Sequence, residues 1–437
     1  MAEAPVTARG WRAVAVGAAA GILLALGVPA ALNRLSEEEC KDDGKLKIAT
    51  GDDVSVGGER RRIIESWGKT QMIEISKVAD LKHAEMLAAA QAAPCQAYDL
   101  LIIDSAVTPE FAAAGLLHEI DPGDVPGGLV PEASASGAWE GRQYALPFAL
   151  DVGLLYRRKE QSRPADWQDL WERTRATAID PAKDVYLAQL DDFEGGTVGL
   201  LELLRAYGAE VVDDDGEIVL DRPENLGNAR TALWRLWWEN QRGTMSGSWS
   251  AKEEESLMAF AEGKAPYLRH WPYAALQLIS RGDPDFHVSE LPGPATLGGS
   301  NLAVTAGSTK YDAAVKLMRH LLTPQNQGVL FACGGYAPVL TAAYTKVSTC
   351  PHGGEDGTPP TRPQLQELAD AVRDTLKGHR AARPKLAHYS RFSDVFRRCV
   401  TKYVLADDPP AEDGIRTIAR ELRVAALGKI EADPPCG

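Results

Sequence analysis

Histidine and cysteine are scarce in this chain of 437 residues, and neither gathers into a metal-binding cluster. The eight histidines are scattered, and the six cysteines include no close pair of the zinc-binding type. The nearest match to a calcium loop surrounds Asp215-Gly216, but glutamate is missing at its twelfth position. We therefore expect no metal ion, and the sequence indicates no other cofactor.

Dense basic patches are also lacking, and the formal net charge is −14. The only dense basic run, ERRR at 59–62, follows a glycine pair and is typical of a solvated helix face. Binding to nucleic acid requires clustered lysine and arginine against the phosphates. We therefore expect no nucleic-acid partner.

Several catalytic signatures are absent as well. The chain has no G-x-S-x-G turn and no Ser/His/Asp constellation, which argues against a serine hydrolase. Carboxylates such as Asp104 and Asp151 could perform the acid–base chemistry of a secreted glycoside hydrolase, so that alternative stays open at this point.

One long apolar run is present at the N-terminus, where residues 13–32 carry no charge. Twenty helical residues span roughly 30 Å, about one hydrocarbon core. Arg9 and Arg12 precede the run and three glutamates at 37–39 follow it, so residues 1–12 are expected in the cytoplasm and the rest outside.

The apolar run could be a cleaved signal peptide or an uncleaved transmembrane anchor. Val28-Pro29-Ala30 is a poor cleavage site, and the length of the run favours the anchor. The expected location is therefore extracytoplasmic, with the protein anchored in the membrane at the cell surface.

All six cysteines follow the apolar run, and an even count in an exported chain favours disulfides. Six cysteines allow 15 pairings. Our hypothesis pairs neighbours in the sequence: Cys40–Cys95, Cys333–Cys350 and Cys399–Cys436. The alternative is that some are buried free thiols. Cys40 does not fit a lipoprotein cysteine, because glutamates precede it.

Strand and helix patterns alternate along the chain. Strands are predicted at 45–49, 73–78, 98–104 and 300–305, and helices at 60–67, 82–93, from 108, at 311–322 and at 412–427. The run YDLLIID at 98–104 is typical of a strand buried between two helical layers. Such alternation predicts an α/β protein with parallel sheets.

The apolar run QYALPFALDVGLLYR at 143–157 is broken by Pro147 and Asp151. We expect one strand to end and another to begin within it, as in a chain that crosses between two lobes. A chain of 437 residues is too long for one ordinary core, so two or three domains are expected.

The stretch 251–275 is the most informative. An amphipathic helix ends at Gly263, a short strand follows at 265–268, and Trp271-Pro272-Tyr273 comes directly after it. The carboxyl ends of strands in open α/β sheets are where ligands bind. The alternative is a core tryptophan and a turn proline.

Seven strings occur together in order between residues 45 and 427: YDLLIIDSAVTPEF, GRQYALPFALDVGLLYRR, RPADWQDLW, DFEGGTV, AFAEGKAPYLRHWPYA, LGGSNLAVT and ARPKLAHYSRFS. In this order the chain resembles the extracellular solute-binding proteins of carbohydrate ABC importers, within bacterial solute-binding family 1 and its actinobacterial disaccharide-binding branch.

The resemblance implies a periplasmic-binding-protein-like fold behind the N-terminal hydrophobic helix. Two α/β lobes would be joined by crossover strands, with a ligand cleft between them. One lobe would comprise 45–148 and 302–345, and the other 149–301 and 346–430.

The resemblance also implies a non-catalytic protein that binds a small solute, most simply a sugar, and delivers it to ABC permease subunits. Sugar hydroxyls suit carboxylates, and sugar C–H faces suit flat aromatic rings. The ligand-binding residues that it implies are Asp52, Asp104, Asp151, Glu194, Trp271, Tyr273, Gly298, Gly299 and Arg383. The alternatives are helix caps or solvated loops for the carboxylates, and a structural salt bridge for Arg383.

Three positions depart from the family pattern. Val107 replaces a usual tryptophan, Ala149 a common asparagine, and Ser300 a usual aromatic residue. The ligand should then differ from a common disaccharide or bind weakly, or the chain is a membrane-anchored sensory or interaction module with an altered cleft. The motif order matches binding proteins, so it disfavours the glycoside hydrolase.

Overall fold

The structure, a computed structural model, describes residues 44–68, 72–77, 83–91, 98–177, 185–345, 347–351, 359–378, 380–429 and Cys436. The residues from Lys45 onward form one unit. The predicted anchor at 13–32, Cys40 and Cys95 lie outside the described residues. Among the helices that are described, none is both long and apolar enough to cross a membrane.

The first sheet carries the strands predicted near the N-terminus. Its order is β12 (Arg380–Ala381), β11 (Ala295–Val304), β3 (Leu100–Asp104), β1 (Leu46–Thr50) and β2 (Ile73–Lys77), with β6 (Ala145–Val152) paired to β11. Strand β1 is parallel to β2 and β3, whereas β11 is antiparallel to β3 and β6. The carboxyl end of β3 therefore lies beside the middle of β11, which brings Asp104 opposite Ser300.

Helices and short turns accompany β1, β2 and β3 of this sheet, and together they form what we call the first lobe, whereas β6, β11 and β12 are crossing strands. They are η1 (Val56–Gly58), α2 (Glu59–Trp67), α3 (His83–Ala90), η3 (Ser105–Val107), α4 (Thr108–Ala113), η4 (Pro122–Asp124), α5 (Pro131–Ser136), α11 (Tyr311–Leu321), α12 (Pro324–Val329), the π-helical turn η6 (Leu330–Gly334) and η7 (Thr341–Tyr344). The small hairpin β4 (Ala138–Trp139) and β5 (Arg142–Gln143) lies against α4.

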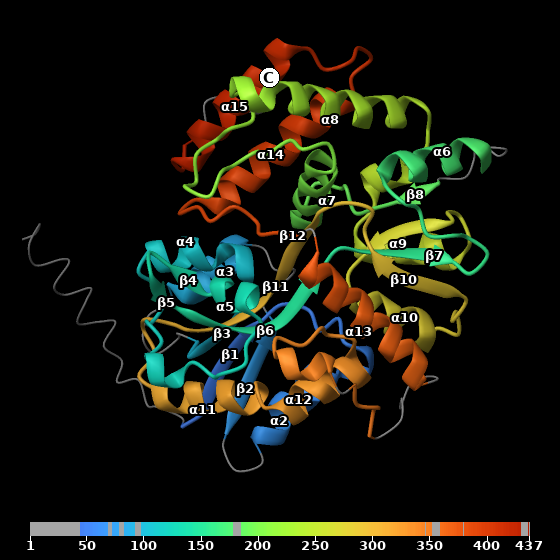
Figure 1. Cartoon of the computed structure of the whole chain (residues 1–437). Helices are drawn as coiled ribbons and strands as arrows, with labels where there is room; N and C mark the ends of the chain where they lie inside the picture. Colours follow the sequence, from blue (N-terminus) through green and yellow to red (C-terminus); the bar gives the residue numbers. More distant parts are fainter. Residues whose placement is uncertain are drawn as a thin grey trace, which may run out of the picture. The chain divides into compact units, whose positions relative to one another are not determined.

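The second sheet has the order β10 (Phe286–Glu290), β7 (Leu154–Arg158), β9 (Tyr267–His270) and β8 (Tyr186–Leu187). Its helices, with which it forms the second lobe, are α6 (Trp167–Thr177), α7 (Glu194–Arg205), α8 (Pro223–Gln241), η5 (Ser246–Ser250), α9 (Glu253–Ala261), α10 (Tyr273–Ser280), α13 (Arg362–Lys377), α14 (Tyr389–Val404) and α15 (Glu412–Ala426). Helices α7, α8, α14 and α15 gather into one helical group (Figure 1).

Strand β6 departs from the sequence prediction, because neither Pro147 nor Asp151 interrupts it. The break before β7 falls at Gly153, where the Glu202 carboxylate comes so close that a Cβ atom would lie 2.3 Å from its Oε1. Pro147 is tolerated because the pairing with β11 shifts register beside it, between Ser300 and Asn301. Asp151 therefore lies inside the crossing strand.

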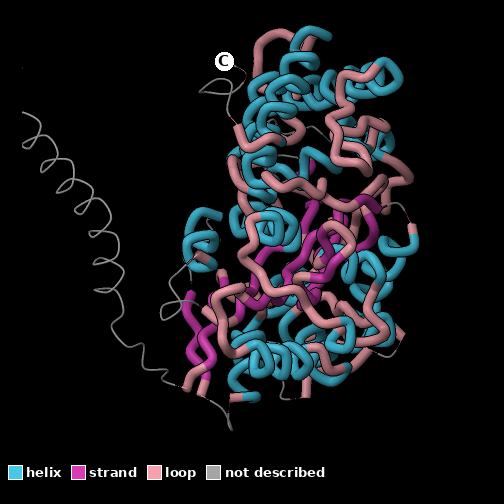
Figure 2. The backbone as a smooth tube through the Cα atoms, turned by 90° about the vertical axis from the view of Figure 1, so that its left-hand side faces the viewer, coloured by secondary structure: helices cyan, strands magenta, loops and turns pink. Residues whose placement is uncertain are grey.

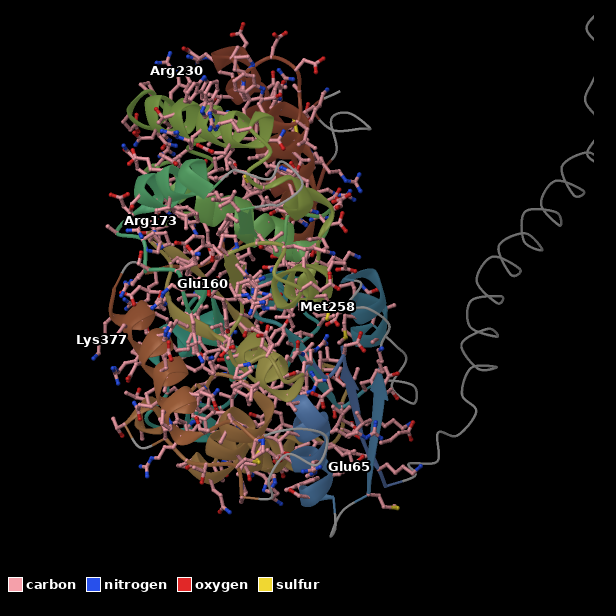
Figure 3. All side chains as sticks on the ribbon, turned by 90° about the vertical axis from the view of Figure 1, so that its right-hand side faces the viewer. Glu65, Glu160, Arg173, Arg230, Met258 and Lys377 are labelled. Atoms are coloured by element: carbon pink, nitrogen blue, oxygen red, sulfur yellow. A yellow bond between two sulfur atoms is a disulfide. The ribbon has the colours of Figure 1, made fainter. Side chains whose placement is uncertain are left out.

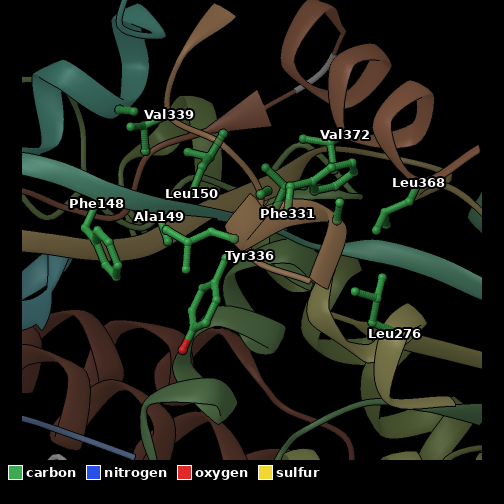
Figure 4. Close-up of a cluster of buried hydrophobic side chains, with 14 of the residues drawn as sticks. Phe148, Ala149, Leu150, Leu276, Phe331, Tyr336, Val339, Leu368 and Val372 are labelled. Carbon is green, nitrogen blue, oxygen red and sulfur yellow. The ribbon is translucent and has the colours of Figure 1, made fainter. Parts of the chain in front are cut away.

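The strands lie between layers of helices (Figure 2), and the main core continues beneath β6 from one sheet to the other. Figure 4 shows the side chains that meet there: Phe148 and Leu150 from β6, Leu276 from α10, Phe331 from η6, Tyr336 and Val339 after it, and Leu368 and Val372 from α13. Charged side chains such as Glu65, Arg230 and Lys377 lie at the periphery (Figure 3). The crossing strand is thus also part of the apolar floor that joins the two lobes.

Two of the predicted disulfides are present, Cys333–Cys350 and Cys399–Cys436. The first ties the π-helical turn to the segment that follows η7, and the second ties α14 to the C-terminal residues. The pair Cys40–Cys95 stays a prediction, since both residues lie outside the described part.

Candidate binding cleft between the two lobes

A cavity of about 490 Å³ lies where the two lobes meet the crossing strands. This volume is within the range of small-molecule pockets. The first lobe contributes η3, α4 and α5 to its wall, β6 and β11 form its floor, and the segment 380–385 closes it. The lining side chains are mostly small or apolar, with these polar members: Ser105, Glu132, Ser136, Arg380, Arg383 and Lys385.

Arg383 connects the two predicted carboxylates Asp104 and Glu194. Its Nη1 donates to Asp104 Oδ2 and to Glu194 Oε1, both at 2.9 Å, and its Nη2 donates to Asp104 Oδ1 and to Ser105 Oγ at 3.0 Å. Burial opposes the charge on the guanidinium, yet the carboxylates of Asp104 and Glu194 hold its pKa well above the ordinary value. The structure therefore brings these three predicted residues together as one charged network, of which Arg383 lines the cavity.

Glu194 is held in place by two further donors from the second lobe. Tyr389 donates its hydroxyl to Glu194 Oε1 at 2.5 Å, and Ser393 donates to Oε2 at 2.6 Å. Glu194 begins α7, where a negative charge is favoured by the exposed N–H groups of the first turn. The carboxylate is thus oriented by two side chains of α14 before any ligand arrives.

The segment from Arg380 to Ser390 makes three more contacts with the first lobe. Arg380 Nε donates to Glu132 Oε1 at 3.0 Å, and Lys385 Nζ donates to the Ala135 carbonyl oxygen at 2.7 Å. Ser390 donates from its backbone N–H and its hydroxyl to Glu110 Oε2, at 3.0 and 2.8 Å. Together with the Arg383–Asp104 pair, these contacts hold the lobes against each other along one side of the cavity.

Asp151 lies on β6 directly opposite Gly298 of β11. A Cβ atom on Gly298, which lines the cavity, would lie 3.4 Å from the Cβ of Asp151. The side chain is half-buried, and the lack of water around it, followed by the charge of Asp104, raises the pKa of Asp151 to about 7. Its carboxylate is therefore an acceptor, and near neutral pH also a donor, beside the cavity floor.

Trp271 follows β9 and is backed by a buried ion pair that the sequence did not reveal. The Arg269 guanidinium lies 3.7 Å from the centre of the Trp271 rings. Arg269 in turn donates to both oxygens of Glu202, at 2.8 and 2.9 Å, and neither side chain is solvent-exposed. A cation over an indole attracts the ring electrostatically, so Arg269 fixes the plane of Trp271.

Tyr273 begins α10 and is buried next to Trp271 and Val198. Val54, in the loop after β1 of the first lobe, packs on this cluster, and Gln277 Nε2 donates to the Val54 carbonyl oxygen at 3.0 Å. Beside Tyr273, burial lowers the pKa of His270 to about 3, so this imidazole is neutral. The predicted aromatic pair is therefore in contact with the first lobe.

The predicted glycines have different roles. Gly298 lines the cavity, with the Trp271 ring about 3.5 Å from where its Cβ would be. Gly299 has a φ of 126° and would place a Cβ 2.2 Å from the Ala149 carbonyl oxygen, so the packing of β6 against β11 already requires glycine there. Asp52 forms an ion pair with Lys77 of β2 and is half-exposed, so the structure does not bring it to the cavity wall.

Aromatic side chains are missing from the described cavity lining, which agrees with the unusual residues noted in the sequence. Ala149 lies on the floor where a polar side chain was expected, and Val107 packs into the apolar core. The small residues of α5, in the run PEASAS, gave no sequence signal for a binding wall. Arg269 and Lys385 lie inside strings that carry the family resemblance, so that signal was available.

Within the described residues, no three histidine, cysteine or acidic side chains are arranged to hold a metal ion. Apart from Asp151, the carboxylates around the cavity are bonded to arginine, indole, hydroxyl or backbone donors. Such a site can bind a polar solute through directed hydrogen bonds.

Solved structures of sugar-binding proteins share this fold. A maltose-bound MalE3 from T. maritima has a TM-score of 0.73 at 24% identity, covering 87% of this chain and 99% of its own. A Thermotoga lettingae ABC transporter solute-binding protein bound with α-D-tagatose has a TM-score of 0.73 at 18% identity, and the match covers 88% of this chain and 100% of that protein. The GacH receptor of Streptomyces glaucescens, solved with acarbose, has a TM-score of 0.71 at 17% identity, and the match covers 89% of this chain and 100% of the receptor. At these identities the likeness establishes the fold: two α/β lobes of the periplasmic-binding-protein type.

Two curated relatives are similar in sequence. A probable ABC transporter-binding protein of Deinococcus radiodurans is 29% identical over 228 residues, and the match covers 47% of this chain and about half, 53%, of that relative. The diacetylchitobiose binding protein DasA of Streptomyces coelicolor is 23% identical over 299 residues, covering 61% of this chain and 68% of DasA.

The family model described as bacterial extracellular solute-binding protein matches residues 73–352. That range begins at β2 and ends just after Cys350, so it includes β3, β6, α7, β9 and β11, which carry most of the predicted site. The chain belongs to the bacterial extracellular solute-binding protein family.

Proposed function

We propose that this protein binds a small polar solute, most simply a sugar, between its two lobes and delivers it to the permease subunits of an ABC importer. It does so without catalysis. Support comes from the family, from structural neighbours bound with maltose or tagatose, and from the DasA relative. No observation favours a sensory role for the altered cleft.

The observation that carries the proposal is the cavity itself. Arg383 and Gly298 line it; Asp104 and Glu194 are bonded to Arg383, and Asp151 and Trp271 lie next to Gly298. Carboxylates and a guanidinium suit the hydroxyl groups of a sugar, and an indole suits its C–H face. Contributions from both lobes couple ligand binding to lobe closure.

The lobe boundaries and the membrane anchor also belong to the proposal. We assign residues 45–148 and 302–345 to the first lobe, and 149–301 and 346–430 to the second. Residues 13–32 would hold the protein at the outer face of the membrane, with 1–12 in the cytoplasm. Recovery of the intact chain from membranes after a high-salt wash is the expected outcome, and a mature N-terminus near Ala31 in the medium would refute the anchor.

A thermal-shift screen against mono- and disaccharides tests the proposal directly. A ligand present at 100 times its Kd should raise the free energy of unfolding by ~2.7 kcal/mol. For a sugar found in this way, Trp271→Ala should weaken binding more than any single carboxylate change, because it removes both contact area and the planar face.

Trp234→Ala is the matched control, since Trp234 is an exposed indole on α8. It should leave the affinity unchanged. Normal binding by Trp271→Ala would show that the site is wrongly placed, and the absence of any stabilising sugar in the screen would contradict the proposed function.

A further inference from the structure

Asp151 differs from every other carboxylate at the cleft in having no side-chain partner among the described residues. Asp104 and Glu194 accept hydrogen bonds from Arg383, and Glu202 accepts from Arg269. Glu253 lies 3.4 Å from Trp271 Nε1. The structure gives the Asp151 carboxylate neither a hydrogen bond nor an ion pair, although it is half-buried. A recessed and unpartnered charge of this kind is costly unless a ligand compensates it.

The surrounding charges do not compensate Asp151. Of the charges that act on Asp151, Asp104 and Glu253 are negative, and Arg269 and Arg383 are positive. Both arginines are already bound to other carboxylates: Arg269 to Glu202, and Arg383 to Asp104 and Glu194. Counting Glu194, Glu202 and Asp151 itself, this network holds five carboxylates and two guanidiniums, which is an excess of negative charge.

The position of Asp151 makes it available to a ligand. Ala149 and Leu150, which precede Asp151 on β6, both line the cavity. Gly298, the partner of Asp151 across the ladder, lines it too, so the half-buried carboxylate lies at the edge of the cavity, beside Gly298 and the Trp271 ring.

Resting on the proposed function, we infer that the natural ligand is an amino sugar, a saccharide whose protonated amine binds Asp151. An ammonium group donates up to three N–H bonds and also neutralises the carboxylate, and charge-assisted hydrogen bonds are about twice as strong as neutral ones. A hydroxyl or an acetamido group would donate a bond and leave the excess charge in place.

The groups around Asp151 also determine how the preference for an amine over a neutral group depends on pH. Asp104 on β3 and Glu253 on α9 repel its charge, and Arg383 and Arg269 attract it. Four tyrosines with raised pKa values, all uncharged near neutrality, lie within its field: Tyr156, Tyr273, Tyr336 and Tyr344. Burial raises the pKa of Asp151 to about 7, so the carboxylate takes up a proton as the pH falls below neutrality. The preference for an amine should therefore shrink on acidification.

Isothermal titration with three matched β-1,4 disaccharides tests the inference: that of glucosamine, its N,N′-diacetyl form and that of glucose. At pH 7 we expect the glucosamine disaccharide to bind at least about tenfold more tightly than the other two. At pH 5 the difference should fall to a few-fold. Asp151→Asn should abolish the difference at both pH values, whereas Asp214→Asn, an equal charge change on an exposed turn, should retain it.

Several outcomes would overturn the inference. Equal or tighter binding of a neutral disaccharide by the unaltered protein would do so while leaving the sugar-binding proposal in place. Failure of all three disaccharides would also refute it, and only failure of the wider sugar screen would remove the proposed function. An unchanged amine preference in a folded Asp151→Asn variant would refute the role of this carboxylate.

Discussion

Arg269 is a buried cation whose partner, Glu202, is equally buried. Glu202 also accepts from the Thr296 backbone N–H at 2.9 Å, so one carboxylate joins β9, α7 and the start of β11. The pair lies directly behind Trp271, and its contribution to the site is to hold that ring. A buried pair of this kind becomes costly when only one member is removed.

We predict that Glu202→Gln lowers the free energy of unfolding by about 3 kcal/mol, because Arg269 would keep its charge without a carboxylate. Urea denaturation of the ligand-free protein measures this. Glu412→Gln is the control, since Glu412 forms an exposed pair with Arg416 and should cost less than about 1 kcal/mol. Equal losses in the two variants would contradict the assignment.

For Asp151 we predict that removing the charge raises the free energy of unfolding, the opposite of the effect at Glu202. Its pKa is raised from 3.8 to about 7, first by burial and then by Asp104, so the folded protein binds a proton that the unfolded chain releases near pH 4. Stability is therefore lost as the pH rises from about 4 to about 7. Asp151→Asn should stabilise the ligand-free protein by about 2–4 kcal/mol at pH 8 and have little effect at pH 4.

Denaturant titrations at both pH values check this, with Asp214→Asn as the variant that should follow the unaltered protein throughout. A gain of the same size at pH 4 and pH 8 would mean that titration of Asp151 is not the cause.

At the residue scale, the sequence predicted the site residues that lie in strings shared with the family. Asp104, Glu194 and Arg383 come from three distant segments, and the structure joins them in one network. The sequence could not predict that Arg383 binds both carboxylates, because these hydrogen bonds depend on how the fold places the three segments in space. It likewise gave no reason to separate Gly299, required by strand packing, from Gly298 at the cavity.

At the scale of elements, the segment from Arg380 to Ser390 and helix α4 hold the lobes together. Glu110 of α4 accepts both the backbone N–H and the hydroxyl of Ser390, in the first turn of α14. A carboxylate at a helix N-terminus satisfies an otherwise unpaired N–H group and is favoured by the helix dipole. Here the capping group comes from the opposite lobe.

Glu110→Ala should therefore destabilise the ligand-free protein by about 1–2 kcal/mol and increase the population with separated lobes. Small-angle scattering of the ligand-free protein should give a larger radius of gyration for this variant. Glu224→Ala changes an acidic residue in the first turn of α8 and should leave scattering unchanged. A radius equal to that of the unaltered protein would show that this contact does not hold the lobes closed.

The sequence predicted most elements because their hydrophobic periodicity is local. It was wrong at Pro147, since proline usually ends a strand. The register shift beside Asn301, on a strand more than 150 residues later, removes the need for the missing N–H. Tertiary pairing thus decided a point that local propensity could not.

At the scale of the whole molecule, disulfides close two loops, with sequence separations of 17 and 37 residues. In the chain-entropy account they stabilise by about 3 and about 4 kcal/mol. The double variant Cys399→Ser with Cys436→Ser should therefore lower the free energy of unfolding by about 4 kcal/mol, measured by denaturant titration.

Mass spectrometry supplies the companion measurement. If Cys40 and Cys95 also pair, the intact mass should lie about six hydrogens below the reduced value. A difference of four hydrogens would leave that third bridge unformed, and six alkylatable thiols would contradict all three.

The pairing of β3 with β11 also constrains how the protein is made. Asp104 of β3 pairs with Ser300 of β11, which lies 196 residues further along the chain. A ribosome adds about 5–20 residues per second, so the edge of β3 waits roughly 10–40 s for its neighbour. During that interval the apolar run LLIID has an open side, which is a template for wrong pairing. The strands β1 to β3 are synthesised first, but their sheet is complete only after β11 has been made. We therefore expect these strands to depend on protection by a chaperone, or to remain unfolded until β11 has been synthesised.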